Sequence, residues 1–234
     1  DADFFEPHFF GIERHRLHRD TTHEDRTAQQ IVARQLLSRL LVLLILEQPT
    51  HQLGPGVVLL ALRQIPGPDQ ARRDEAFRRG YHWMLTFQCK DGGWAAFDKD
   101  CTKSVLEKVP FADHNAMLDP ECADITARIL ELLGYEGYPV TNSQILKALQ
   151  YVRDEQEEDG SWYGRWGVNY IYGTWQVVRG LRALNLNMNQ RWLLRARDWL
   201  ESVQHEDGGW GERCDTYDDP VFKGKGPSTA SQTA

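Results

Sequence analysis

Apolar residues recur at helical spacing along most of the chain, and this pattern predicts a succession of helices. Between Ala28 and Glu47 the apolar positions form one broad face: Ile31, Val32, Leu36, Leu37, Leu40, Leu43, Leu44 and Leu46. The same period predicts helices over 57–63, 69–87, 120–133, 141–155, 172–184 and 189–203. The alternation typical of strands is nearly absent, so we expect an all-α fold with at least six helices.

Turn and cap residues set the expected ends of these helices. Asp119-Pro120 is a good N-cap and first-turn pair, and Gly134 is expected to stop the helix that follows. The stretch 95–118 has the composition of an irregular loop. Residues 1–28 are rich in His, Arg and Asp without a clean period, so we expect poor order there.

One pattern occurs three times: a Gln, an acidic residue with glycine, and a Trp six residues after the Gln. The copies are Gln88-Cys-Lys-Asp91-Gly-Gly-Trp94, Gln156-Glu-Glu-Asp159-Gly-Ser-Trp162 and Gln204-His-Glu-Asp207-Gly-Gly-Trp210. Each copy ends a helical segment, and the copies start 68 and then 48 residues apart. This spacing indicates helix pairs with variable insertions, as in a helical toroid.

The Gln and Trp of each copy are expected to be structural. A Gln side chain can bond free backbone groups at a neighbouring helix end, and a Trp can stack beside it. We therefore expect each Trp to lie buried at a junction between helices, where it identifies the architecture without taking part in chemistry.

The repeats, and most specifically residues 159–174, resemble the bacterial squalene-hopene cyclases, which are class II triterpene cyclases. Residue 159 begins the run Asp-Gly-Ser-Trp-Tyr-Gly-Arg-Trp-Gly-Val-Asn-Tyr-Ile-Tyr-Gly-Thr. Supporting segments are 92–98, 109–120, 123–128 and 224–234. The resemblance implies that 57–234 form a partial (α/α) toroid of helix pairs. Residues 1–56 are unmatched, with one helix, and are expected to be disordered or frame-shifted.

Composition narrows the function classes only slightly. A chain of 234 residues with 41% hydrophobic content can bury a core, but closed toroids of this family are much longer, so we expect a fragment. The net charge of −7 and the lack of a basic patch argue against nucleic acid as a partner. Four Cys without a CxxC spacing indicate reduced thiols rather than a disulfide framework or a zinc site.

The resemblance implies that a linear polyene is cyclised through carbocations, with no metal and no organic cofactor. The family protonates an alkene with the middle Asp of an Asp-X-Asp-Asp-Thr-Ala motif. At the matching positions 51–56 this chain has His-Gln-Leu-Gly-Pro-Gly, with no acidic residue. We interpret the abrupt break near residue 57 as an altered reading frame or a chimeric join. Loss of the acid in a non-catalytic relative, or a compensating acid elsewhere, stays open.

Several supporting residues of the family motifs are present, and the resemblance gives each a role. Asp124 and Arg128 lie four apart on one helix face and match the pair that orients the catalytic acid. Arg128 is permanently cationic, so it could anchor a carboxylate but could not relay a proton. Tyr172 matches the Tyr on the water path that re-protonates the acid. Without the motifs, these residues would be a surface ion pair and a core Tyr.

Aromatic side chains at motif positions are candidates for the cavity wall, because their faces stabilise a cation without quenching it. By resemblance the substrate-binding candidates are Phe97, Phe111 and Trp166, with Arg165 supporting the wall. Phe97 stands where relatives often carry Tyr, and His114 stands where some carry Phe. The alternative for each of these aromatic and His residues is plain core packing.

The resemblance also implies partners and a location. The expected substrate is squalene or a similar polyprenoid, taken from one membrane leaflet by a monotopic protein on the cytoplasmic side of the bacterial membrane; a homodimer is compatible with this. The run Leu40 to Leu46 is too short to span a bilayer. The mean hydropathy of −0.55 and the lack of an amphipathic basic helix in the sequence predict that the membrane-binding surface lies largely outside this chain.

Two other function classes were weighed. A prenyltransferase β-subunit is also a helical toroid, and its zinc would need a set such as Cys101, Asp113 and His114. The motifs around these residues nevertheless resemble the cyclases. A non-catalytic repeat scaffold or interaction fragment is the other class, and the missing acid favours it.

Overall fold

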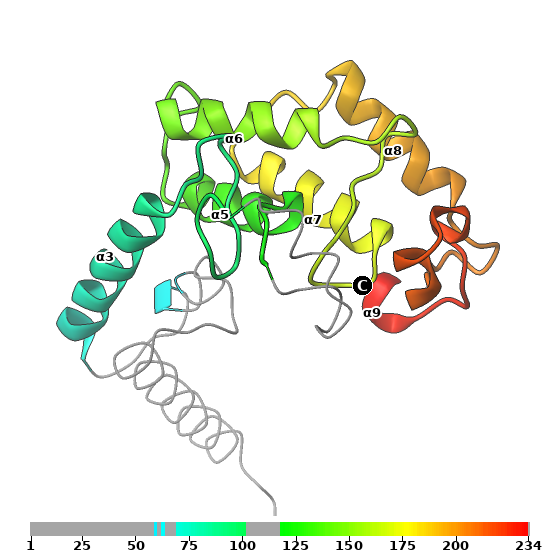
Figure 1. The fold of residues 1–234 in the computed structure, drawn as a ribbon, viewed down its shortest axis with the longest axis horizontal. Helices are drawn as coiled ribbons and strands as arrows, with labels where there is room; N and C mark the ends of the chain where they lie inside the picture. Colours follow the sequence, from blue (N-terminus) through cyan, green and yellow to red (C-terminus); the bar gives the residue numbers. More distant parts are fainter. Residues whose placement is uncertain (1–58, 60–61, 64–68, 102–117, 234) are drawn as a thin grey trace, which may run out of the picture.

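The computed structural model describes residues 59, 62–63, 69–101 and 118–233, and within these ranges it is helical without strands (Figure 1). The main helices are α3 (Gln70–Thr86), α5 (Ala123–Tyr135), α6 (Ser143–Asp154), α7 (Tyr170–Ala183) and α8 (Arg191–Ser202). Three short helices follow: η2 (Cys214–Tyr217), η3 (Pro220–Phe222) and α9 (Ala230–Thr233). The all-α prediction is therefore confirmed. The helix predicted over 28–47 lies outside the described residues.

The helix α5 begins later than predicted. Its N-cap is Cys122, so Asp119 does not cap it and Pro120 is not in its first turn. The Asp119 carboxylate instead accepts a hydrogen bond of 2.7 Å from the backbone N–H of Phe97. Asp119 therefore binds a backbone donor that is distant in the sequence, instead of capping α5 as the sequence suggests.

The helix α5 also ends later than predicted, because it runs through Gly134 to Tyr135. A Cβ on Gly134 would lie 2.5 Å from the backbone of Ala183 at the end of α7, so this glycine allows two helices to approach closely. The left-handed turn after the helix falls at Gly137, with φ of +75°.

The helices α5 and α7 form the centre of the fold and run parallel to each other. Two close backbone approaches lie in the same order along both helices: Ala127 with Gly180, and Gly134 with Ala183. The helices α6 and α8 lie along one edge of this pair (Figure 1). The main core lies among these helices, and no helix in the described ranges is long and apolar enough to cross a bilayer.

The three Gln-Trp turns share one local bonding pattern. Each Trp indole donates to the carbonyl ten residues before it: Met84, Val152 and Leu200. Each Gln amide donates to the carbonyl of the glycine that directly follows the Asp of its own turn: Gly92, Gly160 and Gly208. The aspartates accept from the backbone N–H two residues on, at Gly93, Ser161 and Gly209. The repeat in the sequence is therefore a repeat in structure.

The predicted bond from Gln to a neighbouring helix is confirmed in two turns. Gln88 reaches the carbonyl of Gln144 in α6, and Gln156 reaches that of Trp192 in α8. Gln204 bonds only within its own turn, among the described residues. Burial follows the same division: Trp94 and Trp162 are 1% and 0% exposed, whereas Trp210 is only partly buried.

A threonine completes each turn and sets the register of the central helices. The backbone N–H of the Trp donates to Thr126 in α5, Thr174 in α7 or Thr233 in α9, at 2.9, 3.0 and 3.0 Å. The positions two residues before the first two threonines are Asp124 and Tyr172. Two candidate site residues thus occupy equivalent places on adjacent parallel helices.

Candidate active site

Asp124 is the buried carboxylate of the candidate site. It lies in the first turn of α5, where the helix dipole favours a negative charge, and its side chain is 0% exposed. Its Oδ2 accepts a hydrogen bond of 3.0 Å from the backbone N–H of Trp166. Its Oδ1 has no hydrogen-bond partner among the described residues. A buried acceptor without a partner costs free energy, which marks the position as a candidate for function.

Arg128 lies one turn after Asp124 but bonds to a different helix. Its Nη2 donates to the Tyr172 hydroxyl at 2.9 Å, and its guanidinium carbon lies 5.7 Å from the centroid of that ring. Within the described part of the chain, Asp124 and Arg128 form no ion pair. The arginine therefore orients the tyrosine directly, and the aspartate oxygen is left open.

Tyr172 stays protonated across the physiological range. Burial, and then the Asp124 carboxylate, raise the pKa of Tyr172 to about 12, although Arg128 opposes the rise. A protonated phenol can both donate and accept a hydrogen bond. The arrangement places such a group within the electrostatic reach of Asp124.

Phe97 and Trp166, predicted from motif positions far apart in the sequence, are in contact. Their ring centroids lie 5.4 Å apart in an edge-to-face arrangement. The two residues are 37% and 43% exposed, so they are not core residues. The Trp166 backbone also binds Asp124, so the ring pair and the carboxylate share one segment of the chain. Phe111 and His114, the other aromatic-wall candidates, lie outside the described residues.

Arg165 ties together the segments that carry the ring pair. Its Nε lies 3.6 Å from Asp119 Oδ1, and its Nη2 donates to the Leu118 carbonyl at 3.0 Å. Asp119 also accepts from the Phe97 N–H, so one buried carboxylate joins the loops of Phe97 and Trp166. Burial raises the pKa of Asp119, against the Phe97 and Ala96 N–H groups and Arg165. The sequence alone does not reveal this role, because the Asp119-Pro120 pair also fits a helix cap.

Cys122 is a second residue that the sequence analysis left without a role. Burial, and then the Asp124 carboxylate, raise the pKa of the Cys122 thiol well above its usual value. The thiol is therefore protonated and unreactive beside the aspartate. No motif marks a lone Cys of this kind before the fold is known.

One group of side chains in the described ranges has the spacing of metal ligands. Ligand atoms of Cys89, Asp100 and Glu121 lie within 4.8 Å of one another. Burial, and then a hydrogen bond with Glu121, raise the pKa of the Cys89 thiol to about 12, which disfavours the thiolate that a metal needs. Of the zinc set Cys101, Asp113 and His114, the last two residues lie outside the described residues.

Comparison with known proteins covers most of the chain. The family model described as the squalene-hopene cyclase C-terminal domain matches residues 54–234. The chain is 42% identical over 182 residues to a squalene–hopene cyclase of Zymomonas mobilis, covering 76% of this chain and 28% of that protein. It is 44% identical over 178 residues to a squalene–hopene cyclase of Alicyclobacillus acidocaldarius, with the same two shares.

A third relative carries a different product name. The dammaradiene synthase of Dryopteris crassirhizoma is 41% identical over 197 residues, covering 76% of this chain and 29% of that protein. The chain thus spans less than a third of the length of the relatives it matches.

Proposed function

The chain belongs to the squalene-hopene cyclase family, and we propose that its residues serve the proton-initiated cyclisation of squalene or a similar polyprenoid to hopene or hopanol. The all-α architecture with Gln-Trp turns is part of the (α/α) toroid of this family. In this proposal the chain supplies the acid-orienting group and part of the aromatic wall. The cyclisation itself uses neither metal nor organic cofactor.

The observation that carries the proposal is the open oxygen of Asp124. Protonating an alkene needs a strong acid that stays protonated until the substrate is bound. A buried carboxylate with one oxygen fixed by Trp166 and the other open can accept a hydrogen bond from a second carboxylic acid. Two carboxyl groups in contact share a proton, since both cannot ionise at such a distance.

Arg128 and Tyr172 extend the site toward proton supply. The phenol can pass a proton between water and the acid, because it donates and accepts, and Arg128 fixes its orientation. The arginine itself keeps its charge and takes no part in the relay. This pair therefore suits re-protonation of the acid after each turnover.

Phe97 and Trp166 suit the stabilisation of cationic intermediates. An aromatic face stabilises a desolvated cation by about 2 kcal/mol and offers no lone pair that would quench it. Their edge-to-face contact turns the two rings in different directions, at an interplanar angle of 86°. Arg165 and Asp119 hold both loops in place without presenting a nucleophile to the rings.

The chain as it stands lacks the acid of the Asp-X-Asp-Asp motif, since positions 51–56 contain no carboxylate. We therefore expect that the purified chain forms no hopene from squalene, as measured by gas chromatography. We further expect a chimera to be active in which residues 57–234 replace the matching segment of the Zymomonas mobilis enzyme. The matched control carries the Alicyclobacillus acidocaldarius segment at the same junctions. A folded chimera that leaves squalene unchanged, while the control converts it, would contradict the proposal.

A non-catalytic scaffold is the second candidate, and the missing acid is the observation that favours it. Restoring Asp-X-Asp-Asp at positions 51–54 separates the two functions. Turnover of squalene by the restored chain indicates a damaged enzyme. A folded but inert restored chain, together with an inactive chimera, indicates a scaffold.

The proposal extends to the place of action, the cytoplasmic side of a bacterial membrane, where a monotopic protein takes squalene from one leaflet. A homodimer is compatible with such an arrangement. The segment Leu36 to Leu46 lies outside the described residues. Liposome flotation tests the location: we expect this chain to stay in the aqueous layer and the chimera to float.

A further inference from the structure

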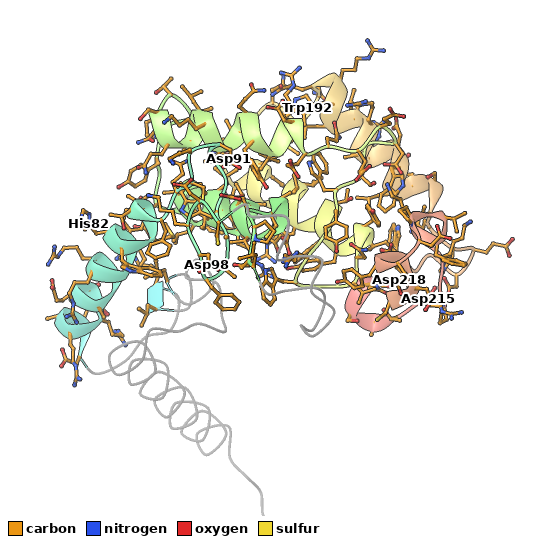
Figure 2. All side chains as sticks on the ribbon, viewed as in Figure 1. His82, Asp91, Asp98, Trp192, Asp215 and Asp218 are labelled. Carbon is orange, nitrogen blue, oxygen red and sulfur yellow. The ribbon has the colours of Figure 1, made fainter. Side chains whose placement is uncertain are left out.

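A second cavity lies away from the Asp124 site, between the end of α6 and the start of α8. Its volume is about 610 Å³, and it is lined by Arg153, Asp154, Gln190, Arg191, Trp192 and Arg195. Figure 2 labels Trp192 at the top of the view, where α8 begins. The cyclisation proposal uses none of these residues.

The cavity is cationic in a chain whose net charge is −7. Three guanidinium groups line it against the single carboxylate of Asp154, which already accepts a hydrogen bond of 2.7 Å from Gln150. Within the described part of the chain, Arg153 and Arg191 form neither an ion pair nor a side-chain hydrogen bond. Three exposed arginines therefore line this open cavity with a single carboxylate among them, and two of the three have no protein partner in the described part of the chain.

The third arginine is held in place. Arg195 Nη2 donates to Gln156 Oε1 at 2.7 Å, which ties the cavity wall to the second Gln-Trp turn. Trp192 forms a further fixed wall, because its ring packs edge-to-face on buried Trp162 at 6.0 Å and its Nε1 donates to Gln190 at 2.9 Å. The Gln190 side chain accepts this bond and forms no capping hydrogen bond with the backbone N–H groups at the start of α8.

We propose that this cavity binds a phosphate group. Guanidinium forks match phosphate oxygens in bidentate geometry, and several arginines around one cavity favour an oxyanion of high charge. The positive end of the α8 dipole adds to the same field. A phosphate group could belong to a soluble phosphate ester or to the headgroup of a phospholipid, and both present the same oxygens to the arginines.

Titration calorimetry of the full chain with inorganic phosphate and with glycerol phosphate tests the site. We expect saturable binding that weakens with added salt, and an about tenfold loss of affinity for each of Arg153→Gln and Arg191→Gln. Arg72→Gln is the matched control, because Arg72 is an exposed arginine on α3. The proposal would be overturned if the variant that combines Arg153→Gln and Arg191→Gln bound phosphate as tightly as the unchanged chain. It would also be overturned if Arg72→Gln lost as much affinity as the cavity variants.

Flotation with phosphatidylcholine vesicles, with and without phosphatidylglycerol, separates the two sources of phosphate. Binding to the anionic vesicles that both variants abolish identifies a lipid headgroup as the ligand. Saturable binding of glycerol phosphate, with no effect of the variants on flotation, identifies a soluble ester. If neither the esters nor the vesicles bind in a way that depends on these arginines, the site does not exist.

Discussion

The second and third Gln-Trp turns share a sequence pattern and the same Gln, Asp and Trp hydrogen bonds within the turn, yet they differ in what lies against them. Gly160 faces the backbone of Arg195 so closely that a Cβ would lie 2.7 Å away, whereas a Cβ on Gly208 would meet nothing within 4 Å. Trp162 is 0% exposed, and Trp210 is only partly buried. The motif therefore encodes the turn, while the neighbouring helix determines how deeply the turn is buried. Matched substitutions in the two turns should therefore have unequal effects.

The largest difference is expected at the tryptophans. Trp162→Ala removes a fully buried ring and should lower the free energy of unfolding by about 3–5 kcal/mol. Trp210→Ala should cost about half as much, because its ring is already partly in water. Urea denaturation followed by circular dichroism measures both. Equal losses would show that burial against the next helix does not separate the turns.

Gly160 and Gly208 have similar backbone conformations, with φ of +98° and +82°. Alanine variants at these two positions therefore differ mainly in what the added methyl group contacts. Alanine at either position costs about 1–2 kcal/mol for the left-handed backbone. Gly160→Ala should cost about 1–3 kcal/mol more, since it also overpacks against Arg195. The difference between the two variants in urea denaturation isolates the docking of α8. No difference would mean that the helix shifts aside freely.

The glutamines should show a smaller effect of the same kind. Gln156→Ala loses bonds to the Gly160 and Trp192 carbonyls and to Arg195, whereas Gln204→Ala loses only the bond to Gly208. We expect losses of about 2 kcal/mol and about 1 kcal/mol in the free energy of unfolding. Amide hydrogen exchange at the start of α8 should be faster in Gln156→Ala but not in Gln204→Ala, because only Gln156 bonds to that helix.

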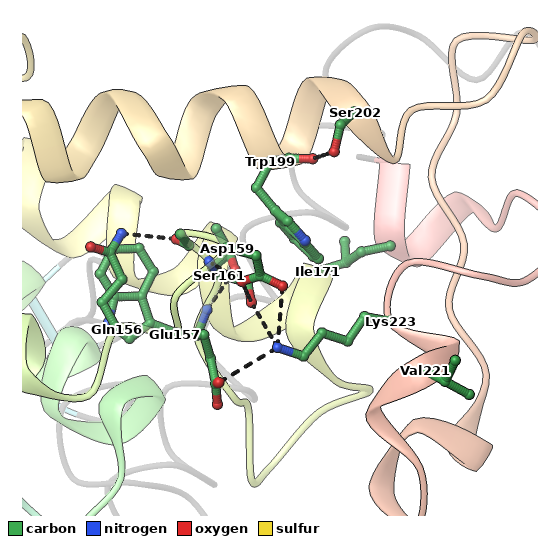
Figure 3. Close-up of polar contacts among 12 residues, drawn as sticks. Gln156, Glu157, Asp159, Ser161, Ile171, Trp199, Ser202, Val221 and Lys223 are labelled. Carbon is green, nitrogen blue, oxygen red and sulfur yellow. Dashed lines mark hydrogen bonds and ion pairs between the residues drawn. The ribbon is translucent and has the colours of Figure 1, made fainter.

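The smallest effect concerns a clamp on the second turn. Figure 3 shows the Lys223 ammonium among Asp159, Ser161 and Glu157, at 3.2, 3.4 and 3.6 Å. Burial alone would raise the pKa of Asp159, but hydrogen bonds from Ser161 and the charge of Lys223 lower it below its usual value. Because the pKa of Asp159 is lowered in the folded state, its carboxylate stabilises the fold at pH values above the usual pKa of an aspartate. That stabilisation is lost as the pH falls through the pKa that Asp159 has in the folded state.

Lys223→Met should therefore cost under about 1 kcal/mol at neutral pH, since the partners are partly exposed. The part of this cost that comes from Asp159 should be lost as the pH falls below the usual Asp pKa of 3.8, whereas the contact of Lys223 Nζ with the Tyr170 ring, 4.0 Å from its centroid, does not depend on pH in this range. Lys225→Met is the matched control, because Lys225 is exposed and follows closely in the chain. Thermal unfolding across the pH range measures both. A cost that does not change with pH would contradict the clamp.

Much of this fold followed from the sequence, because its determinants are local. The apolar period marked α3, α6, α7 and α8 to within two residues at each end. The Gln, Asp and Trp of each turn bond within one short segment, so their spacing was visible as a repeat. The predicted bounds of α5 were wrong for the opposite reason, because both depend on distant contacts. Asp119 accepts a hydrogen bond from the Phe97 N–H, and Gly134 packs against the backbone of Ala183 on another helix.

Sequence motifs likewise predicted some residues of the candidate site, whereas other contacts depend on the fold. Family motifs pointed to Asp124, Tyr172, Phe97 and Trp166, and the structure places them on neighbouring segments. The threonines that set the register lie 32, 12 and 23 residues after their tryptophans, so no fixed spacing reveals them. The bond from Arg128 to Tyr172 depends on the crossing of α5 and α7, which no local pattern encodes.

The Gln-Trp turns hold the fold, and we propose that Asp124 serves the chemistry. The direct test is the rate of triterpene formation by the Zymomonas mobilis chimera carrying Asp124→Asn. Asparagine keeps the bond to the Trp166 N–H but cannot carry the charge that orients an acid. The control is Asp198→Asn, the same change at a side chain that is 60% exposed. The account predicts a loss of at least about a hundredfold for Asp124→Asn, with an unchanged melting temperature and an unaffected control. An equal rate in both variants would contradict it.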